Sequence, residues 1–143
     1  ELSPELPQVV WLDPTRLRQL LYNLLSNAIK FTERGEVHLD VQVRPGEQPP
    51  QLTLVFHVRD TGIGMSTEAA ARLFERFYQI DSTLTRRRGG SGLGLYICYN
   101  IITTKLGGTI HCSSTPGEGT RFDIRFPADL PAAPAAAPHE ANP

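Results

Sequence analysis

Two neighbouring stretches of the chain alternate apolar and polar residues, and this pattern constrains the fold more than any other feature. Apolar side chains occupy every second position over residues 37–43 and again over residues 52–58, with a Pro- and Gly-containing turn at 45–50 between them. Such alternation is typical of strands that bury one face, and a short connection favours antiparallel neighbours. We therefore expect a sheet with one buried and one solvated face.

Helical patterns flank these strands. Asp13 and Pro14 are a typical N-cap and first residue of a helix, which the sequence predicts to run to about residue 31 or 32. A short helix is expected after Ser66, and a long one over 93–106. Short strands are predicted at 9–12, 109–113 and 120–126, the last two forming a hairpin. This order of elements predicts an α/β two-layer sandwich with helices on one face of a mixed sheet.

Composition limits the classes of function. The chain has 143 residues, which suits one domain, and a net charge of -1, so no large basic field indicates nucleic-acid binding. Two cysteines make no disulfide framework, and we expect both to be reduced thiols. No apolar run approaches the roughly 20 residues of a membrane helix. Residues 1–8 are expected to be a frayed lead-in, and the Ala/Pro-rich residues 127–143 a linker.

The first helix carries a polar ridge beside its apolar stripe. With Leu17 at zero and about 100° per residue, Asn23, Asn27 and Lys30 fall at roughly 240°, 280° and 220°, and Phe31 at about 320°. Amide oxygens suit Mg²⁺, and an ammonium group suits phosphate. The ridge is therefore either a ligand-binding edge or a solvated helix flank.

The sequence Asp60-Thr61-Gly62-Ile63-Gly64-Met65 follows the second alternating run. Strand parity places Asp60 on the apolar side, which is costly unless a donor such as an adenine amino group meets the carboxylate. Gly62 and Gly64 would let backbone approach a flat base. The alternative is a capped junction between a strand and a turn.

A glycine-rich segment precedes the last helix. Residues 89–95 read GGSGLGL, and glycines before a helix N-terminus are suited to phosphate, although a flexible hinge has the same composition. The spacing matches neither a dinucleotide fingerprint nor a Walker loop. Three arginines, Arg86 to Arg88, precede the glycines and either contact phosphate or solubilise a mobile loop over residues 79–92. Gly117-Glu118-Gly119-Thr120 is an ordinary hairpin turn unless Thr120 faces the same pocket.

Taken in order, these segments resemble the ATP-binding catalytic domain (HATPase_c) of bacterial-type sensor histidine kinases, hybrid kinases included, within the gyrase/Hsp90/kinase/MutL (GHKL) superfamily. LRQLLYNLLSNAIKFT resembles the N box, DTGIGM the G1 box, LFERFYQ the F box and GGSGLGL the G2 box. The resemblance covers about residues 9–126. It implies the Bergerat fold, a mixed, mostly antiparallel sheet of about five strands with about three helices on one face.

The resemblance also implies a protein-histidine kinase that uses ATP and Mg²⁺. Asn27 would hold Mg²⁺, with Asn23 assisting directly or through water, Lys30 would contact phosphate, and Phe31 would flank the base. Asp60 would accept a hydrogen bond from adenine, and Thr120 would support that end. The remaining implied nucleotide-binding residues are Gly62, Ile63, Gly64, Arg87, Gly90, Ser91, Gly92, Leu93, Gly94 and Leu95, beneath an ATP lid of about residues 79–92.

Two departures from the family pattern matter. Gln79 stands where many members have arginine, which leaves the phosphate contact to a lid arginine. None of the four histidines has the phosphoacceptor context, so the implied partner is a histidine on upstream dimerisation helices, with a response regulator or receiver domain further on. The domain is expected to be cytoplasmic and monomeric, in a parent anchored in the inner or plasma membrane.

Two other functions stay open on the sequence. A GHKL-type ATPase typically has a glutamate one turn before the magnesium-binding Asn, whereas this chain has Asn23, which cannot take a proton from water near neutral pH. A regulatory module that binds nucleotide without catalysis would keep the same motifs.

Overall fold

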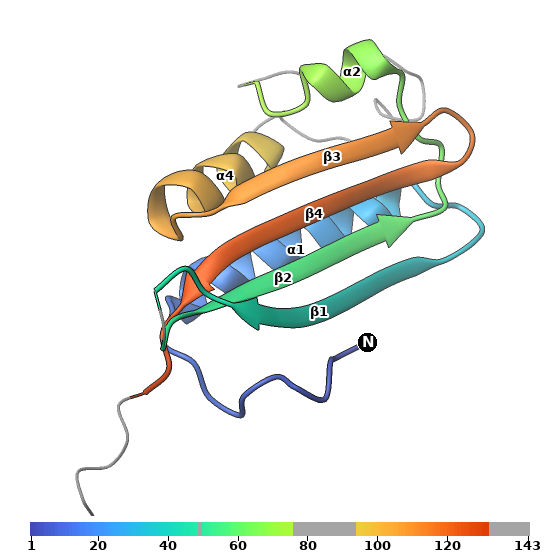
Figure 1. The fold of residues 1–143 in the computed structure, drawn as a ribbon. Helices are drawn as coiled ribbons and strands as arrows, with labels where there is room; N and C mark the ends of the chain where they lie inside the picture. Colours follow the sequence, from blue (N-terminus) through green and yellow to red (C-terminus); the bar gives the residue numbers. More distant parts are fainter. Residues whose placement is uncertain (49, 76–93, 132–143) are drawn as a thin grey trace, which may run out of the picture.

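The chain folds into two layers, a sheet and a set of helices on one of its faces (Figure 1). The structure, a computed structural model, describes residues 1–48, 50–75 and 94–131. The strands are β1 (Val37–Pro45), β2 (Leu52–Asp60), β3 (Thr109–Thr115) and β4 (Gly119–Ala128), in the order β1-β2-β4-β3 with every neighbouring pair antiparallel. The helices are α1 (Pro14–Lys30), α2 (Thr67–Ala71) and α4 (Gly94–Asn100), which continues into a π-helical turn, η1 (Ile101–Lys105).

The predicted alternation sets the register of the sheet. Val41, Phe56 and Ile124 lie side by side on β1, β2 and β4, and all three are buried beneath the helices. The rings of Phe56 and Phe126 stack at 5.4 Å between centroids, and Leu20 and Leu24 of α1 are fully buried in the same cluster. The two-layer sandwich predicted from the sequence is confirmed.

Side-chain caps begin the first two helices, as predicted. Asp13 accepts hydrogen bonds from the backbone N–H groups of Thr15 and Arg16, at 3.0 and 3.2 Å. Ser66 accepts from the N–H of Ala69 at 3.1 Å. Because these caps satisfy N–H groups that lack an intrahelical partner, they fix where α1 and α2 begin.

The last helix differs from the prediction in its second half. A single helix over residues 93–106 was expected, but regular α-helix ends at Asn100 and a π-helical turn follows. The hydroxyl groups of Thr103 and Thr104 donate to the carbonyls of Tyr99 and Asn100, at 2.8 and 2.6 Å. Threonine hydroxyls that bond the backbone in this way compete with regular helical hydrogen bonds. Both of these threonine bonds lie within the wider π-helical turn.

The N-terminal residues also differ from expectation. Residues 9–12, predicted as a short strand, form only an isolated bridge between Trp11 and Asp129. The first residues, expected to be frayed, are bonded to β1: Leu2 forms a parallel bridge with Val41, and the N–H of Ser3 donates to the carbonyl of Val41 at 2.9 Å. This contact makes the edge of an otherwise antiparallel sheet mixed.

An aromatic contact joins the turn after α2 to α4. The ring of Phe74 stacks on Tyr99 at 5.5 Å between centroids and lies 6.2 Å from Phe122. Phe74 therefore packs between α4 and β4. Within the described part of the chain, no helix is long and apolar enough to cross a membrane.

Candidate functional site

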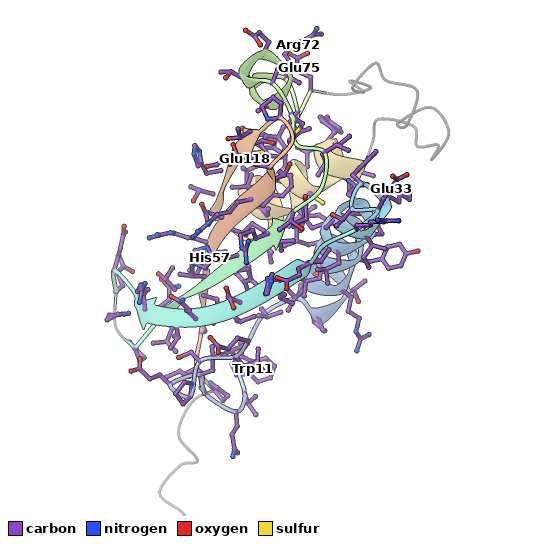
Figure 2. The ribbon with its side chains drawn as sticks, turned by 90° about the vertical axis from the view of Figure 1, so that its right-hand side faces the viewer. Trp11, Glu33, His57, Arg72, Glu75 and Glu118 are labelled. Atoms are coloured by element: carbon purple, nitrogen blue, oxygen red, sulfur yellow. The ribbon has the colours of Figure 1, made fainter. Side chains whose placement is uncertain are left out.

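The candidate site lies at one end of the sandwich, on the right in Figure 1. The C-terminal ends of α1 and β2 meet there with the turn between β3 and β4. Figure 2 looks onto this end, with Glu33 in the loop after α1 and Glu118 in the β3–β4 turn on either side. Residues 61–65, which leave β2, pass between these two segments.

Asp60, the last residue of β2, is the one buried charged side chain among the described residues, with 8% of its surface exposed. Its Oδ1 accepts a hydrogen bond from the backbone N–H of Gly62 at 2.9 Å, and the backbone N–H of Thr120 also bonds to the carboxyl group. Burial raises the pKa of Asp60, and these two hydrogen bonds oppose the shift. Among the described residues no cationic side chain contributes, so the carboxylate keeps acceptor sites for a donor from outside.

Hydrogen bonds tie the loop after Asp60 to the end of α1. The N–H of Ile63 donates to the carbonyl of Phe31 at 3.2 Å. The N–H of Thr61 donates to the carbonyl of Glu36 at 3.1 Å, and the N–H of Glu36 donates to the Thr61 hydroxyl at 2.8 Å. The position of Asp60 is therefore fixed relative to the last turn of α1.

The opposite side of the loop is tied to the β3–β4 hairpin. The N–H of Met65 donates to the Ser114 hydroxyl at 2.8 Å, and the N–H of Gly117 donates to the carbonyl of Ile63 at 2.7 Å. Ser114 also lies 2.9 Å from the Thr120 hydroxyl. The sequence did not single out Ser114, although strand parity relative to Thr120 would have placed both hydroxyls on the helix side of the hairpin.

Gly62 and Gly64 are required by contacts between protein segments. A Cβ added to Gly62 would lie 2.2 Å from the carbonyl oxygen of Phe31, and one added to Gly64 would lie 2.0 Å from that of Thr115. Gly64 also has a positive φ of 68°, which favours glycine. These glycines let the loop pack against α1 and β3, whereas the sequence argument assigned them to close approach by a base.

The polar ridge predicted on α1 divides into two parts. Asn23 lies one turn before Asn27 and beside Cys98, a fully buried residue of α4 whose thiol donates to the carbonyl of Leu20 at 3.8 Å. Asn27 and Lys30 lie on the last turn, partly exposed, and neither side chain hydrogen-bonds within the described parts of the chain. Asn27 and Lys30 therefore offer unpaired polar groups at this end of the fold, and Asn23 lies deeper, toward α4.

A second side chain that the sequence did not single out lies beside Gly62. The Thr32 hydroxyl is buried and has no hydrogen-bond partner in the described structure. A Cβ on Gly62 would lie 2.8 Å from it. Buried hydroxyl groups are nearly always hydrogen-bonded, so an unpaired one next to the Asp60 loop favours a site that is completed by a ligand or water.

The structure describes only the end of the glycine-rich segment. Arg87, Gly90, Ser91, Gly92 and Leu93 lie outside the described residues, as do Gln79 and the predicted lid at about residues 79–92. Gly94 and Leu95 open α4, and Leu95 packs against the core. The phosphate end of the site is therefore described only from α1 and the start of α4.

These groups fit a nucleotide with a bound Mg²⁺. A buried anionic acceptor suits an amino group on a flat base, and the Lys30 ammonium suits phosphate. The described residues contain no cluster of three or more His, Cys, Asp or Glu side chains that could hold a metal. An amide oxygen such as that of Asn27, together with phosphate oxygens and water, is the kind of ligand set that Mg²⁺ accepts.

The fold and the acid-containing end define a two-layer ATP-binding domain. Residues 12–130 match the family described as histidine kinase-, DNA gyrase B- and HSP90-like ATPases. The chain belongs to this family, as the resemblance of its motifs indicated, and it is an ATP-binding domain of the histidine kinase type.

Relatives of known sequence and structure agree. The chain is 45% identical to the autoinducer 2 sensor kinase/phosphatase LuxQ of Vibrio cholerae over 122 residues, covering 85% of this chain and 14% of LuxQ. It is 40% identical to the sensor histidine kinase RcsC of Escherichia coli over 126 residues, covering 88% and 12%. Among solved structures, full-length ShkA in complex with AMPPNP has a TM-score of 0.76 and 36% identity, covering 92% of this chain and 25% of that one. The catalytic domain of histidine kinase ThkA has a TM-score of 0.60 and 27% identity, covering 81% and 69%. The chain spans only a small part of the two curated relatives.

Proposed function

We propose that this domain binds Mg-ATP and donates the γ-phosphate to a histidine on a separate helical domain, in two-component signalling. Family membership supports ATP binding and a kinase role. The observation that carries the rest is the buried Asp60 carboxylate, which in the described part of the chain is held by backbone N–H groups alone and lies at the same end as the last turn of α1.

Adenine recognition is assigned to Asp60. Its carboxylate accepts a hydrogen bond from the adenine amino group, and this charge-assisted bond offsets the cost of burying the acid. Thr120, its cross-strand neighbour, supports the base from β4. Phe31 flanks the base from the end of α1, while Gly62, Ile63 and Gly64 shape the loop beneath it.

Triphosphate binding is assigned to the end of α1 and the glycine-rich segment. Asn27 holds Mg²⁺ through its amide oxygen and Lys30 contacts phosphate; a bound Mg²⁺ neutralises charge on the phosphate oxygens. Arg87, Gly90, Ser91, Gly92, Leu93, Gly94 and Leu95 complete this side. Asn23, one turn earlier on α1, assists Asn27 at the Mg²⁺ directly or through water.

In the transfer step, a neutral imidazole nitrogen attacks the γ-phosphorus. A nitrogen–phosphorus bond forms, the bond from phosphorus to the β,γ-bridging oxygen breaks, ADP leaves, and the imidazole loses its other proton. A neutral imidazole is already nucleophilic, so the domain contributes mainly positioning and charge neutralisation. Asn23, at the position where an ATPase would need a base for water, is consistent with a kinase.

The acceptor helices and further domains belong to the parent protein. The curated relatives are about seven to eight times longer than the matched region, since it covers 14% and 12% of them. We infer that the catalytic domain follows the lead-in at 1–8 and extends past the expected end at residue 126, because β4 reaches Ala128 and Asp129 bridges Trp11. The Ala/Pro-rich residues after Asp129 then form the linker, and the domain lies on the cytoplasmic side of a membrane-anchored parent. The receiver domain or response regulator then takes the phosphate from the histidine.

The function is tested by mixing the chain with Mg-ATP labelled at the γ-phosphate and with the helical segment that precedes it in the parent. The expected result is label on that segment that is stable in base and lost in acid, as phosphohistidine requires. Omitting Mg²⁺ should abolish labelling, and Asp123→Asn, on the far face of the sheet, is the matched control that should retain it.

Two outcomes would overturn the proposal. Rapid steady-state release of phosphate by the chain alone would identify an ATPase. Tight binding of a non-hydrolysable ATP analogue without any transfer to the histidine segment would identify a regulatory nucleotide-binding module.

A further inference from the structure

The Ser114 hydroxyl lies within hydrogen-bonding distance of three groups at this end of the fold. It lies near the end of β3, on the helix side of the hairpin, opposite Thr120. Its hydroxyl oxygen is 2.8 Å from the N–H of Met65, 2.9 Å from the carbonyl of Gly119 and 2.9 Å from the hydroxyl of Thr120. The loop after β2 and the start of β4 thus both bond to one oxygen atom of β3.

The chemistry of a hydroxyl group assigns a direction to each of these bonds. Serine has one proton to donate and two lone pairs that accept. The carbonyl of Gly119 can only accept, so it takes the Ser114 proton, while the N–H of Met65 can only donate and uses one lone pair. The remaining lone pair faces Thr120, and the Thr120 hydroxyl therefore donates its proton to Ser114.

This assignment determines what Thr120 offers to a ligand. With its only proton directed at Ser114, its oxygen presents lone pairs to any other group. Its cross-strand neighbour Asp60 is also an acceptor when ionised, and two of its roughly four acceptor positions are used by the N–H groups of Gly62 and Thr120. Two adjacent side chains, at the end of β2 and the start of β4, thus offer a ligand acceptor positions and no proton.

We infer that Ser114 is a positioning residue for base specificity: by holding the Thr120 proton it makes this end of the pocket acceptor-only. An acceptor-only pocket binds a base with an amino group at position 6 and disfavours a 6-oxo purine, whose carbonyl oxygen would face two acceptors without a hydrogen between them. The inference rests on the proposed binding of ATP and adds the residue that makes the pocket select 6-amino over 6-oxo purine nucleotides.

The test compares the affinities for ATP and for inosine triphosphate, which has a carbonyl in place of the amino group. Ser114→Ala frees the Thr120 proton to turn toward the base, so we expect the ratio of the two affinities to fall about tenfold. Ser114→Thr keeps the hydroxyl and should stay within about twofold of the wild-type ratio. Ser113→Ala, the exposed neighbour on the other face of β3, is the matched control and should leave the ratio unchanged.

Each outcome decides the question. If Ser114 is merely structural, Ser114→Ala will weaken both nucleotides equally and the ratio will not move, which overturns the inference. If that variant does not fold, Thr120→Val, of similar shape, replaces it: its ratio should also fall, and an unchanged ratio counts against the inference. A wild-type chain that binds neither nucleotide contradicts the proposed function itself, whereas wild-type preference for ATP with an unaltered Ser114→Ala ratio contradicts only the role of Ser114.

Discussion

The sheet carries a partly or fully buried aspartate on each face, and the two side chains are stabilised by different groups. Asp123, on the outer face of β4, accepts a hydrogen bond from Arg121 at 2.8 Å and contacts the ring of His57, which Figure 2 shows on the side of the sheet away from α1. Asp60, on the helix side of β2, has only backbone N–H groups as partners among the residues that the structure describes. The acid on the outer face has its charge neutralised by neighbouring side chains, whereas the acid beneath the helices keeps its charge and free acceptor positions.

The pKa values of the two acids differ in the same sense. Burial raises the pKa of Asp60. Burial also acts on Asp123, but hydrogen bonds and attraction from Arg121 and His57 outweigh it and lower the pKa. A buried acid without a cationic partner lowers stability when it ionises, which is a common feature of functional sites. The comparison therefore favours the Asp60 end as the proposed ligand site and a structural role for Asp123.

Removing Asn27, the proposed magnesium ligand, should have the largest effect. Asn27→Ala should lower phosphotransfer on the order of 10²–10³-fold, because the phosphate charge is no longer neutralised. Asn23→Ala should cost about tenfold or less, since Asn23 lies deeper, beside Cys98, and only assists Asn27. Phosphohistidine formation at saturating Mg-ATP is the measurement. Equal losses in the two variants would contradict the division of the α1 ridge.

Stability should be more sensitive to an added methyl group in the loop after Asp60 than at the tip of the β3–β4 hairpin. Gly64→Ala places a methyl group 2.0 Å from the carbonyl of Thr115 at a φ of 68°, and should lower the free energy of unfolding by about 2–3 kcal/mol. Gly117→Ala, with a φ of 79° and nothing within 4 Å of its Cβ, should cost about 1 kcal/mol. Chemical denaturation of both variants checks the order, and a larger cost at Gly117 would contradict it.

Opposite pH dependence is the smallest of the expected effects. The folded chain binds a proton at Asp60 more tightly than the unfolded chain, so stability falls as pH rises from 3.8 through the raised folded pKa. The contribution of Asp123 is present above 3.8 and is lost as pH falls through its lowered folded pKa. Denaturation curves from about pH 3 to pH 7 should show that Asp60→Asn removes the loss of stability with rising pH. Asp123→Asn should remove the gain of stability with rising pH. If both variants changed the pH dependence of stability in the same direction, this would count against the comparison.

Much of the fold follows from local patterns in the sequence. Alternation around Phe56 and the caps Asp13 and Ser66 predicted the strands and the starts of two helices, because each depends on neighbours in the chain. The π-helical turn at Ile101 and the pairing of Leu2 with Val41 were not predicted. The first depends on which carbonyls two threonines select, and the second depends on an edge that exists only after the sheet has formed.

The site was predictable to a similar degree. Parity placed Asp60 on the buried face, and helical periodicity placed Asn27 and Lys30 on one edge of α1. Ser114 and Thr32 were missed because their importance comes from hydrogen bonds across the fold, or from the lack of one, and neither leaves a local pattern. Asn23 shared the ridge by angle, but only the packing of α4 shows that it lies beside Cys98.

The most direct test of the central claim is calorimetric titration of a non-hydrolysable ATP analogue with Mg²⁺ into the wild-type, Asp60→Asn and Asp123→Asn chains at neutral pH. We expect Asp60→Asn to weaken binding by about 10- to 100-fold, because it replaces the anionic acceptor with an amide. Asp123→Asn should leave the affinity within about twofold of wild type. Unchanged affinity in Asp60→Asn, or equal losses in both variants, would contradict the account.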